Sequence, residues 1–364
     1  MRKLNIAQVS PLWFRVPPKG FGGVELIVSR LTEGLVKRGH KVTLFASGDS
    51  KTKAKLVSVV KKNLSDLKIP LLASGYSILN LIETFSRQEE FDIIHSHIDK
   101  FDFIFRAHAK VPTISTLHNP IWPYPLLKKT KSGLYHDTEG VLSAYARFPK
   151  LPYIAISNNY IKNCPIRLNF IKTIYPGVDI KRLKFNPKPE DYFVWLGRIS
   201  PVKGLHIAIK IAKKLGIKLL IGGCPIREEN QEYLEKEIKP HFSKKIKFLG
   251  EIKSDKEKSE LLGNAKALIY PLLWEEPFGL VMIESQACGT PVIAFKRGSV
   301  EELVKHNVTG LVCKTEKEMI KAIKKIDNLE RIECRKWVEK NFTIEKMVEN
   351  HEKLYYQLIE KFHR

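Results

Sequence analysis

The chain has 364 residues, of which 43% are hydrophobic and 10% are aromatic. This length suits two α/β domains better than one, and the apolar content supports ordered cores and excludes a globally disordered chain. No apolar run approaches the roughly 20 residues of a transmembrane helix. Residues 1–10 lead directly into a strand pattern and lack the apolar core of a signal peptide.

The formal net charge is +23 and it is uneven, because residues 1–188 carry +17 and residues 189–364 carry +6. The basic first half predicts an anionic partner, such as acidic membrane lipid or a phosphorylated acceptor, although a solvated lysine-rich surface explains it equally well. No nucleic-acid-binding motif is present, so nucleic acid is not an expected partner. Scattered cysteines without a CxxC pair predict free thiols in a reducing cytosol; they are Cys164, Cys224, Cys288, Cys313 and Cys334.

In the first half of the chain, apolar strand patterns alternate with helical ones. Strands are predicted at residues 4–10, 41–47, 92–97, 113–118 and 153–157. Between the first two strands, residues 24–37 have one apolar face at helical spacing, and Gly39 follows as a left-handed cap residue would.

The same plan repeats from residue 193. Strands are predicted at residues 193–198, 218–222, 246–250, 267–272, 291–295 and 310–313, and helices at 205–215, 229–238, 255–263 and 279–288. Nearly all-apolar strands separated by helices predict parallel sheets covered on both faces. The expected fold class is therefore α/β, with two Rossmann-like, doubly wound domains that face each other across a cleft.

A change of character near residues 176–192 predicts the domain boundary. A turn there is followed by residues 181–189, which are basic, contain prolines and lack clear periodicity, as expected of a linker. The expected domains are residues 1–180 and 190–343. Residues 344–364 form an amphipathic C-terminal helix that could pack back on the first domain.

A glycine-rich loop lies between the first strand and the first helix, at residues 17–25. Gly20, Gly22 and Gly23 would let a ligand approach the backbone, and the helix start supplies free N–H groups. A dinucleotide fingerprint would need glycine where Glu25 stands, and the ending of a P-loop is missing. The alternative is a helix-entry loop that is rich in turn residues.

The turn at residues 196–204 carries two cations at the mouth of a strand. Arg198 can bind phosphate oxygens in a fork and Lys203 can act as a point charge, so the pair suits a pyrophosphate. The alternative is a solvated basic turn. In the first half, His118 follows an apolar strand and would line the expected cleft. His95 and His97 end another strand, where a structural role is the more frequent one.

Residues 274–284 hold two carboxylates, Glu276 in a Pro-Phe-Gly turn and Glu284 about two turns inside the following helix. The start of that helix offers N–H donors and a partial positive charge. An anionic ligand held there, with carboxylates to bind hydroxyl groups, indicates a phosphorylated sugar. No Asp-x-Asp pair occurs in the chain, so Arg198 and Lys203, rather than a divalent metal ion, are expected to neutralise the phosphate charge.

Several segments together resemble glycosyltransferase family 4, retaining enzymes of the GT-B fold. The resemblance covers most of the chain, and its most specific part is the E-x7-E arrangement combined with G-R-x-x-x-x-K-G. The N-terminal loop PPKGFGGVE resembles a subgroup that includes antibiotic and cofactor glycosyltransferases. The matching segments are GGVE, RGHKVTLFA, DIIHSH, TLHN, YPGVD, LGRISPVKG, EEPFGLVMIE and ACGTPVIAF.

The resemblance implies roles for single residues. Arg198 and Lys203 match the diphosphate-binding pair, Glu276 the carboxylate that binds donor-sugar hydroxyls, and Glu284 the one that binds the ribose. His118 matches a histidine near the sugar 6-hydroxyl, although relatives often have Asp where Asn119 follows it. The remaining matches are a loop that approaches phosphate and acceptor, at Gly22 and Gly23, and backbone donors at Phe278, Gly279, Leu280 and Val281.

The resemblance implies a retaining hexosyltransferase that needs no metal or other cofactor. A nucleotide diphosphate sugar, UDP-sugar before GDP-mannose, would bind the second domain, and an acceptor that is anionic or lipid-linked would bind the first. Domain closure would align the two. A helical separation of roughly 12 Å argues against a glycosidase pair at Glu276 and Glu284.

Two alternatives remain, a GT-B epimerase of nucleotide sugars and a non-catalytic sugar-nucleotide-binding protein. The expected location is the cytoplasm, with peripheral contact to the inner face of the membrane. Residues 121–131, where aromatic residues lie beside cations, predict either a membrane-interface segment or an acceptor loop.

Overall fold

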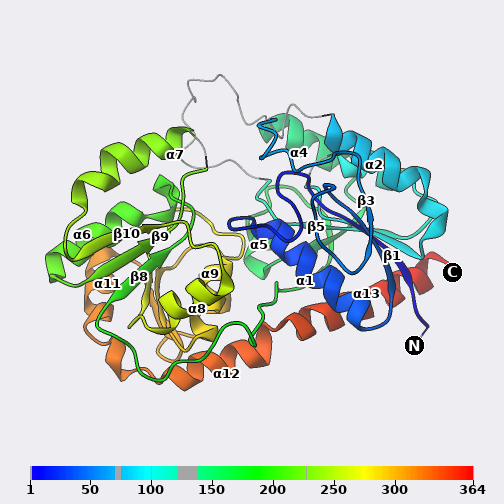
Figure 1. Ribbon diagram of the computed structural model, residues 1–364. Coiled ribbons are helices and arrows are strands. Elements are labelled where there is room, and N and C mark those ends of the chain that lie inside the picture. Colours follow the sequence, from blue (N-terminus) through cyan, green and yellow to red (C-terminus); the bar gives the residue numbers. More distant parts are fainter. Residues whose placement is uncertain (1, 70–74, 100, 122–137, 227, 364) are drawn as a thin grey trace. The chain divides into compact units, whose positions relative to one another are not determined.

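The computed structural model describes residues 2–69, 75–99, 101–121, 138–226 and 228–363. Among these, the chain forms two compact units, each described below by itself (Figure 1). The first unit takes the described residues up to 121, then 138–177 and 344–363. The second unit takes residues 178–343.

The first unit contains a seven-stranded sheet with the order β3-β2-β1-β4-β5-β6-β7, in which every pairing is parallel. Its strands are β1 (Asn5–Val9), β2 (Lys41–Phe45), β3 (Lys55–Val57), β4 (Ile93–Ser96), β5 (Thr113–Leu117), β6 (Pro152–Ala155) and β7 (Asn169–Thr173). Its helices are α1 (Gly23–Lys37), α2 (Tyr76–Ser86), α3 (Asp102–Ala107), α4 (Thr138–Arg147), α5 (Asn158–Asn163) and α13 (Ile344–Phe362).

The second unit contains a six-stranded parallel sheet with the order β10-β9-β8-β11-β12-β13. Its strands are β8 (Phe193–Leu196), β9 (Leu219–Gly222), β10 (Ile246–Gly250), β11 (Leu268–Tyr270), β12 (Val292–Phe295) and β13 (Gly310–Cys313). Its helices are α6 (Leu205–Leu215), α7 (Glu228–Tyr233), α8 (Asp255–Gly263), α9 (Leu280–Ala287), α10 (Val300–Leu303), α11 (Glu316–Ile323) and α12 (Arg331–Asn341).

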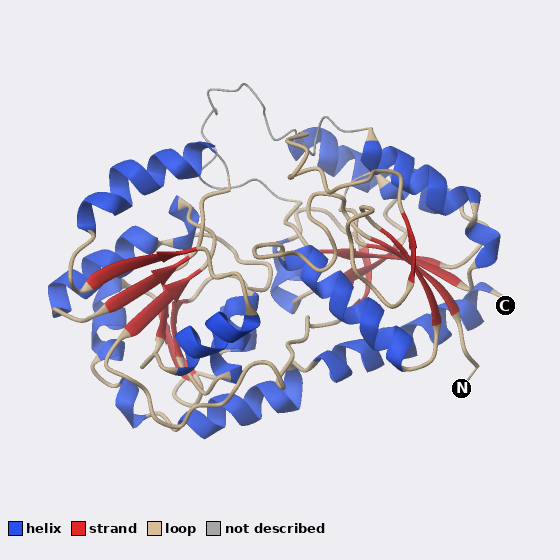
Figure 2. Ribbon diagram, viewed as in Figure 1, coloured by secondary structure: helices blue, strands red, loops and turns tan. Residues whose placement is uncertain are grey.

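Helices cover both faces of each sheet, as the apolar strands predict (Figure 2). The strands predicted from the sequence are all present, and no end differs from its predicted position by more than two residues. The two strands that were not predicted, β3 and β7, lie at the two edges of the first sheet. Both are partly exposed, so they lack the continuous apolar run that identifies the central strands.

In both sheets the strand order reverses beside the first strand of the unit, between β1 and β4 and between β8 and β11. Ligands of doubly wound sheets bind outside the carboxyl ends of the strands at such a switch point. The loops that follow these four strands carry most of the candidate residues predicted from the sequence, so the topology positions a candidate site in each unit.

The predicted boundary near residues 176–192 includes the crossing between the units at residues 177–178, but the linker predicted within it, at residues 181–189, is wrong. The chain passes between the units at residues 177–178 and 343–344, and the predicted linker packs on the second unit. Leu183 is buried, the Asn186 side chain donates to Asn264 Oδ1 at 2.7 Å, and Arg331 donates to the Asn186 carbonyl at 2.7 Å. These side chains satisfy the backbone of an irregular segment, a contact that local periodicity does not reveal.

Helix α13 packs along α1 in the first unit (Figure 1). A Cβ atom on Gly34 would lie only 2.3 Å from Cγ2 of Val348, so the two helices approach where α1 has no side chain. Glu352 of α13 accepts from Arg38 at 2.9 Å and contacts His40 at 2.7 Å. The C-terminal helix is therefore anchored by both close packing and charge.

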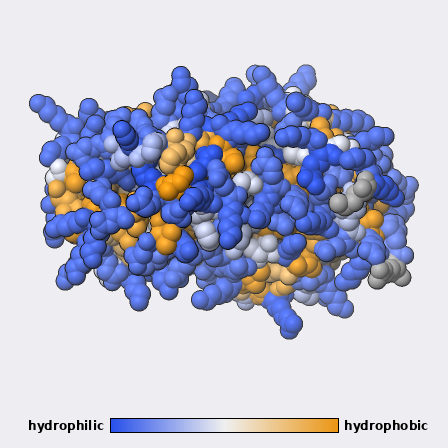
Figure 3. Space-filling view, turned by 90° about the horizontal axis from the view of Figure 1, so that it is seen from below, coloured by the Kyte–Doolittle hydropathy of each residue, from blue (hydrophilic) through white to orange (hydrophobic). Residues whose placement is uncertain are grey.

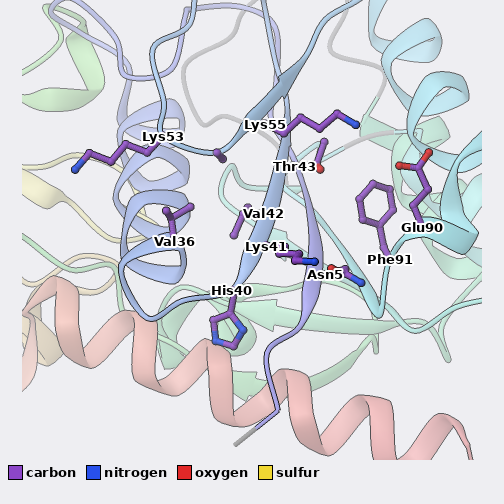
Figure 4. A pocket seen from close by; sticks show the side chains of 11 residues that line it. Asn5, Val36, His40, Lys41, Val42, Thr43, Lys53, Lys55, Glu90 and Phe91 are labelled. Atoms are coloured by element: carbon purple, nitrogen blue, oxygen red, sulfur yellow. The ribbon is translucent and has the colours of Figure 1, made fainter.

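A cavity of about 370 Å³ lies at the amino-terminal ends of β1, β2 and β3, between Lys41, Lys55, Glu90 and Phe91 (Figure 4). It lies away from the carboxyl ends of these strands and does not coincide with the candidate residues. The face shown in Figure 3 is mostly hydrophilic, with apolar residues in small groups. No helix in the described part of the chain has the length and apolarity to cross a membrane.

Gly34→Ala should lower the free energy of unfolding by about 1–3 kcal/mol, the usual cost of overpacking, because its methyl group would collide with Val348. Urea denaturation measures this change. Gly75→Ala is the control, since no atom of the described residues lies within 4 Å of the Cβ position, and its effect should stay within about 0.5 kcal/mol. The double variant Gly34→Ala/Val348→Ala should be more stable than the sum of the single changes predicts. Strict additivity would contradict the contact.

Candidate functional site

In the second unit, the turn after β8 is fixed against the loop after β11. Residues 201–203 form a 3-10 turn, and Gly204 follows with φ +70°. A Cβ atom on Gly204 would lie 1.9 Å from the carbonyl oxygen of Pro271, so only glycine permits this approach. Leu273 N–H donates to the Val202 carbonyl at 2.9 Å. These two contacts join the loops at the residues on either side of Lys203.

Lys203 and Glu276 form a buried ion pair, and Trp274 contacts both of them. The Lys203 ammonium group binds Glu276 Oε2, and the Trp274 indole N–H donates to the same oxygen at 2.8 Å. Lys203 Nζ lies 4.9 Å from the centroid of the Trp274 ring, within cation–π range. The side chains of Lys203 and Glu276 are only 10% and 9% exposed. One carboxylate oxygen therefore holds two donors in a fixed arrangement.

Arg198 lies close enough to Lys203 for their charges to interact. Burial lowers the pKa of Lys203, the Glu276 carboxylate opposes that shift, and the Arg198 guanidinium group adds to it. Two cations near one another at the carboxyl end of β8 favour an anion at this place. The structure thus brings together Arg198, Lys203 and Glu276, as the motifs predict.

The loop that carries Glu276 is held by its backbone. Ser299 N–H donates to the Glu276 carbonyl at 3.0 Å, and its hydroxyl donates to the carbonyl of Phe278. A Cβ atom on Gly298 would lie 2.2 Å from the Glu276 backbone, so Gly298 lets the two segments touch. Gly279, with φ +87°, caps α9, and Leu280 and Val281 form its first turn. Phe278–Val281 therefore lie at the helix start, as predicted.

The expected depth of Glu284 is wrong. Helix α9 begins at Leu280, so Glu284 lies about one turn inside it rather than two, and Glu276 precedes the helix altogether. The helical separation predicted for the two carboxylates consequently does not apply. Glu284 is buried and accepts from Lys258 of α8 at 2.9 Å. The two glutamates are therefore held by two different lysines.

In the first unit, the loop after β1 leads to α1 through Gly22, whose φ is +149°. A Cβ atom on Gly22 would lie 2.7 Å from Cβ of Pro18, so the loop closes tightly on itself. Gly23 is the first residue of α1. Glu25, in the first turn of α1, is buried and accepts from the Phe14 N–H at 3.2 Å. In the sequence, Glu25 was considered only as a departure from the dinucleotide fingerprint. In the structure, its carboxyl group holds the loop through the Phe14 N–H.

His118, at the end of β5, belongs to a buried polar network. Its Nε2 lies 2.9 Å from Nδ1 of His97, and its backbone N–H donates to Asp99 at 2.8 Å. Asn119 donates to the other oxygen of Asp99. Burial lowers the pKa of His118 to about 3 and that of His97 well below the usual value, so both rings are neutral.

His95 and His97 take part in the same hydrogen-bonded network. This is a structural role, which the sequence favoured for these two residues. His95 contacts Tyr355 of α13 at 2.6 Å and Thr116 at 2.8 Å. No group of three or more His, Cys, Asp or Glu side chains within the described ranges could hold a metal ion. Most of residues 121–131, the predicted interface or acceptor loop, lie outside the described residues.

Sequence reasoning missed Gln8, Trp274 and Tyr355. Trp274 stands two residues before Glu276, and an aromatic residue beside a paired carboxylate is a signal that could have found it. Tyr355 contacts the network from a helix at the other end of the sequence, and Gln8 lies among the buried apolar residues of β1. No local pattern identifies these two residues.

Two family models match the chain, the Glycosyltransferase Family 4 model at residues 21–182 and the Glycosyl transferases group 1 model at residues 179–343. An uncharacterized glycosyltransferase of Methanocaldococcus jannaschii is 28% identical over 357 residues, which cover 93% of this chain and 95% of that protein. The D-inositol 3-phosphate glycosyltransferase of Mycobacterium avium is 25% identical, with coverages of 79% and 76%. The crystal structure of Anabaena HepE in complex with UDP-glucose has a TM-score of 0.72 at 19% identity, covering 97% of this chain and 100% of that one.

Glu25→Gln should make the protein more stable at pH 8. Burial raises the pKa of Glu25 from 4.5 to about 7. The folded state therefore holds a proton that the unfolded chain releases, and stability falls as pH rises from about 4.5 to 7. The loss above that window is on the order of 3 kcal/mol. Glutamine cannot ionise and still offers Phe14 N–H an oxygen.

Urea unfolding of both proteins at pH 4 and pH 8 measures this difference. The two proteins should have similar stability at pH 4, where both side chains are neutral. As the pH rises, the free energy of unfolding of the variant should exceed that of the wild type. An identical pH dependence of the two proteins would show that Glu25 ionises at its ordinary value.

Proposed function

With both halves matching glycosyltransferase models, the chain is a glycosyltransferase of the family 4 type with the GT-B fold, and we propose that it transfers a hexose, with retention, from a nucleotide diphosphate sugar to an acceptor hydroxyl. UDP-sugar is the proposed donor, with GDP-mannose as the second choice. A nucleotide-sugar epimerase and a non-catalytic binder are favoured by neither match. The PPKGFGGVE subgroup stays a prediction.

The observation that carries the proposal is the buried arrangement of Lys203, Glu276 and Trp274 beside Arg198. A nucleotide diphosphate sugar needs cations for its phosphates and hydrogen-bonding groups for its sugar hydroxyls. Arg198 and Lys203 supply the first, and Glu276 supplies the second from the same loop junction. The structurally similar HepE is known in complex with UDP-glucose, which supports a donor of this class.

The proposed transfer step uses the diphosphate as a leaving group. As the bond between the anomeric carbon and the phosphate oxygen breaks, negative charge gathers on the diphosphate, and Arg198 and Lys203 stabilise it. A phosphate oxygen takes the proton of the acceptor hydroxyl on the same face of the sugar, so the configuration is retained. Glu276 and Glu284, each bound to a different lysine, do not act as a glycosidase pair in this scheme.

The proposal needs no metal ion, because the two cations and the start of α9 meet the phosphate charge. The acceptor is proposed to be anionic or lipid-linked and to bind the basic first unit. A relative named for D-inositol 3-phosphate supports an anionic acceptor. The alternative is a lysine-rich surface with no such partner.

We also propose that the first unit associates with anionic membrane through α2. Ile78, Leu79 and Ile82 are 43%, 48% and 48% exposed, while the same helix buries Asn80 and Thr84. The preceding segment exposes three lysines, and its Ile69 packs in one apolar cluster with Tyr76 at the start of α2. Apolar side chains beside cations suit the surface of an acidic membrane; the lysines are Lys61, Lys62 and Lys68.

The donor should be identified by thermal-shift measurements with UDP-, GDP- and ADP-sugars, because a ligand at about 100 times its Kd stabilises a folded protein by about 2.7 kcal/mol. With the identified donor, Lys203→Ala and Glu276→Ala should lower the transfer rate about 100-fold or more. Lys210→Ala, which removes an exposed lysine paired with Glu316, is the control. Transfer should also persist in EDTA.

Three results would contradict the proposal. Transfer at the wild-type rate by Lys203→Ala and Glu276→Ala would show that these residues do not form the donor site. Donor turnover without any acceptor would indicate an epimerase. Loss of transfer in EDTA with recovery on Mg²⁺ addition would contradict the metal-independent scheme.

Ile78→Ser/Ile82→Ser should reduce flotation with vesicles that contain 30% phosphatidylserine by about 10-fold, because burial of two large apolar side chains is lost, at ~1.5–3 kcal/mol each when complete. Ile332→Ser is the matched control, since Ile332 is 40% exposed on α12 of the second unit. Equal flotation of all three proteins, or binding that ignores anionic lipid, would exclude this surface.

A further inference from the structure

Six side chains in the first unit form one continuous chain of hydrogen bonds that ends at His118. His118 Nε2 pairs with His97 Nδ1 at 2.9 Å, and His97 Nε2 pairs with Gln8 Oε1 at 2.8 Å. Gln8 Nε2 donates to the Tyr355 hydroxyl at 3.0 Å. That hydroxyl pairs with His95 Nδ1 at 2.6 Å, and His95 Nε2 pairs with Thr116 Oγ1 at 2.8 Å.

The Gln8 amide gives this chain a direction. An amide oxygen only accepts, so His97 Nε2 carries a hydrogen. His97 is neutral, so its Nδ1 has none and accepts from His118 Nε2–H. His118 is also neutral, which leaves its Nδ1 with a lone pair.

The other half of the chain agrees with this direction. The Tyr355 hydroxyl accepts from Gln8 and therefore donates its hydrogen to His95 Nδ1. His95 Nε2–H then donates to Thr116. Reversal of the Gln8 amide would reverse every bond in the chain and place a hydrogen on His118 Nδ1.

His118 Nδ1 is the open end of the chain. It is a buried nitrogen with no hydrogen-bond partner among the described residues, and His118 as a whole is 5% exposed. A buried acceptor without a partner costs stability. Such an atom at the end of a strand, at the edge where ligands of this fold bind, is placed to receive a hydrogen from a ligand.

We propose that Gln8 and Tyr355 are positioning residues that hold His118 as the tautomer whose Nδ1 accepts a hydrogen from a substrate hydroxyl. The substrate is that of the glycosyl transfer proposed above, and the inference rests on it. The site then requires a hydroxyl that donates at this place. A fluorine or methoxy substituent, which cannot donate, is rejected.

This proposal also gives α13 a part in the site. The helix lies at the far end of the sequence from β1, yet its Tyr355 fixes the amide of Gln8 on that strand. The neighbouring His351 packs near His95, with ring centroids 5.4 Å apart, but bonds to the Met347 carbonyl of its own helix. His351 shares the burial of Tyr355 without belonging to the chain, so it offers a matched control.

The direct test is the tautomer of His118 in the free protein, read from ¹⁵N NMR of histidine-labelled protein at pH 7. The His118 signals are assigned by their loss in His118→Gln. The expected result is a protonated Nε2 and an unprotonated Nδ1. A protonated Nδ1 in the wild type would overturn the proposal even if every variant failed to fold. Because this measurement uses no substrate, it can fail or succeed independently of the glycosyltransferase assignment.

Two variants test the positioning roles. Gln8→Leu and Tyr355→Phe should each give His118 a mixture of both tautomers and lower kcat/KM about 10-fold. His351→Leu should change neither. The contrary result is that Tyr355→Phe and His351→Leu have the same effect on the His118 tautomer and lower kcat/KM by the same factor. In that case the hydrogen bonds serve only to pack the interior, and the positioning roles are wrong.

Discussion

The second unit depends on one buried ion pair, between Lys203 and Glu276. Removing one partner of a buried pair usually costs about 3–5 kcal/mol, so the surrounding structure must keep both charges satisfied. Trp274 gives Glu276 a second donor and Lys203 an aromatic face. Gly204 and Gly298 let the three loops of the site touch at distances that any side chain would prevent. The stability of the second unit and the geometry of its loops therefore both depend on the contacts of Glu276 Oε2.

The two units have the same kind of sheet but differ in the charge of the polar side chains at their candidate sites. The second unit gathers the cations Arg198 and Lys203 near its switch point, where they favour an anionic ligand. The first unit buries neutral imidazoles whose pKa values are lowered by burial, and these can accept or donate hydrogen bonds without attracting an ion. The cations of the second unit suit an anionic group, whereas the neutral imidazoles of the first unit suit a hydroxyl group.

The sequence could predict the features whose residues lie close together along the chain, and it missed those whose partners are distant. Arg198, Lys203 and Glu276 were predicted because each stands in a short motif after an apolar strand, and parallel strands end at one edge. The linker at residues 181–189 failed because its stabilising partners, such as Arg331, are distant in sequence. Gln8 and Tyr355 are separated by 347 positions, so no local pattern joins them. The depth of Glu284 was wrong because the Pro-Phe-Gly turn after Glu276 is not part of α9, which begins only at Leu280.

Calorimetric binding of UDP and UDP-glucose tests most directly whether Lys203 holds the diphosphate and Glu276 the sugar. Lys203→Met should weaken both ligands by a similar factor of about 10 or more, the worth of one charge-assisted hydrogen bond. Glu276→Gln should weaken UDP-glucose while leaving UDP as tight as in the wild type, because the freed Lys203 still meets the phosphates. Equal weakening of UDP and UDP-glucose by Glu276→Gln, or unchanged UDP binding by Lys203→Met, would contradict this division of roles.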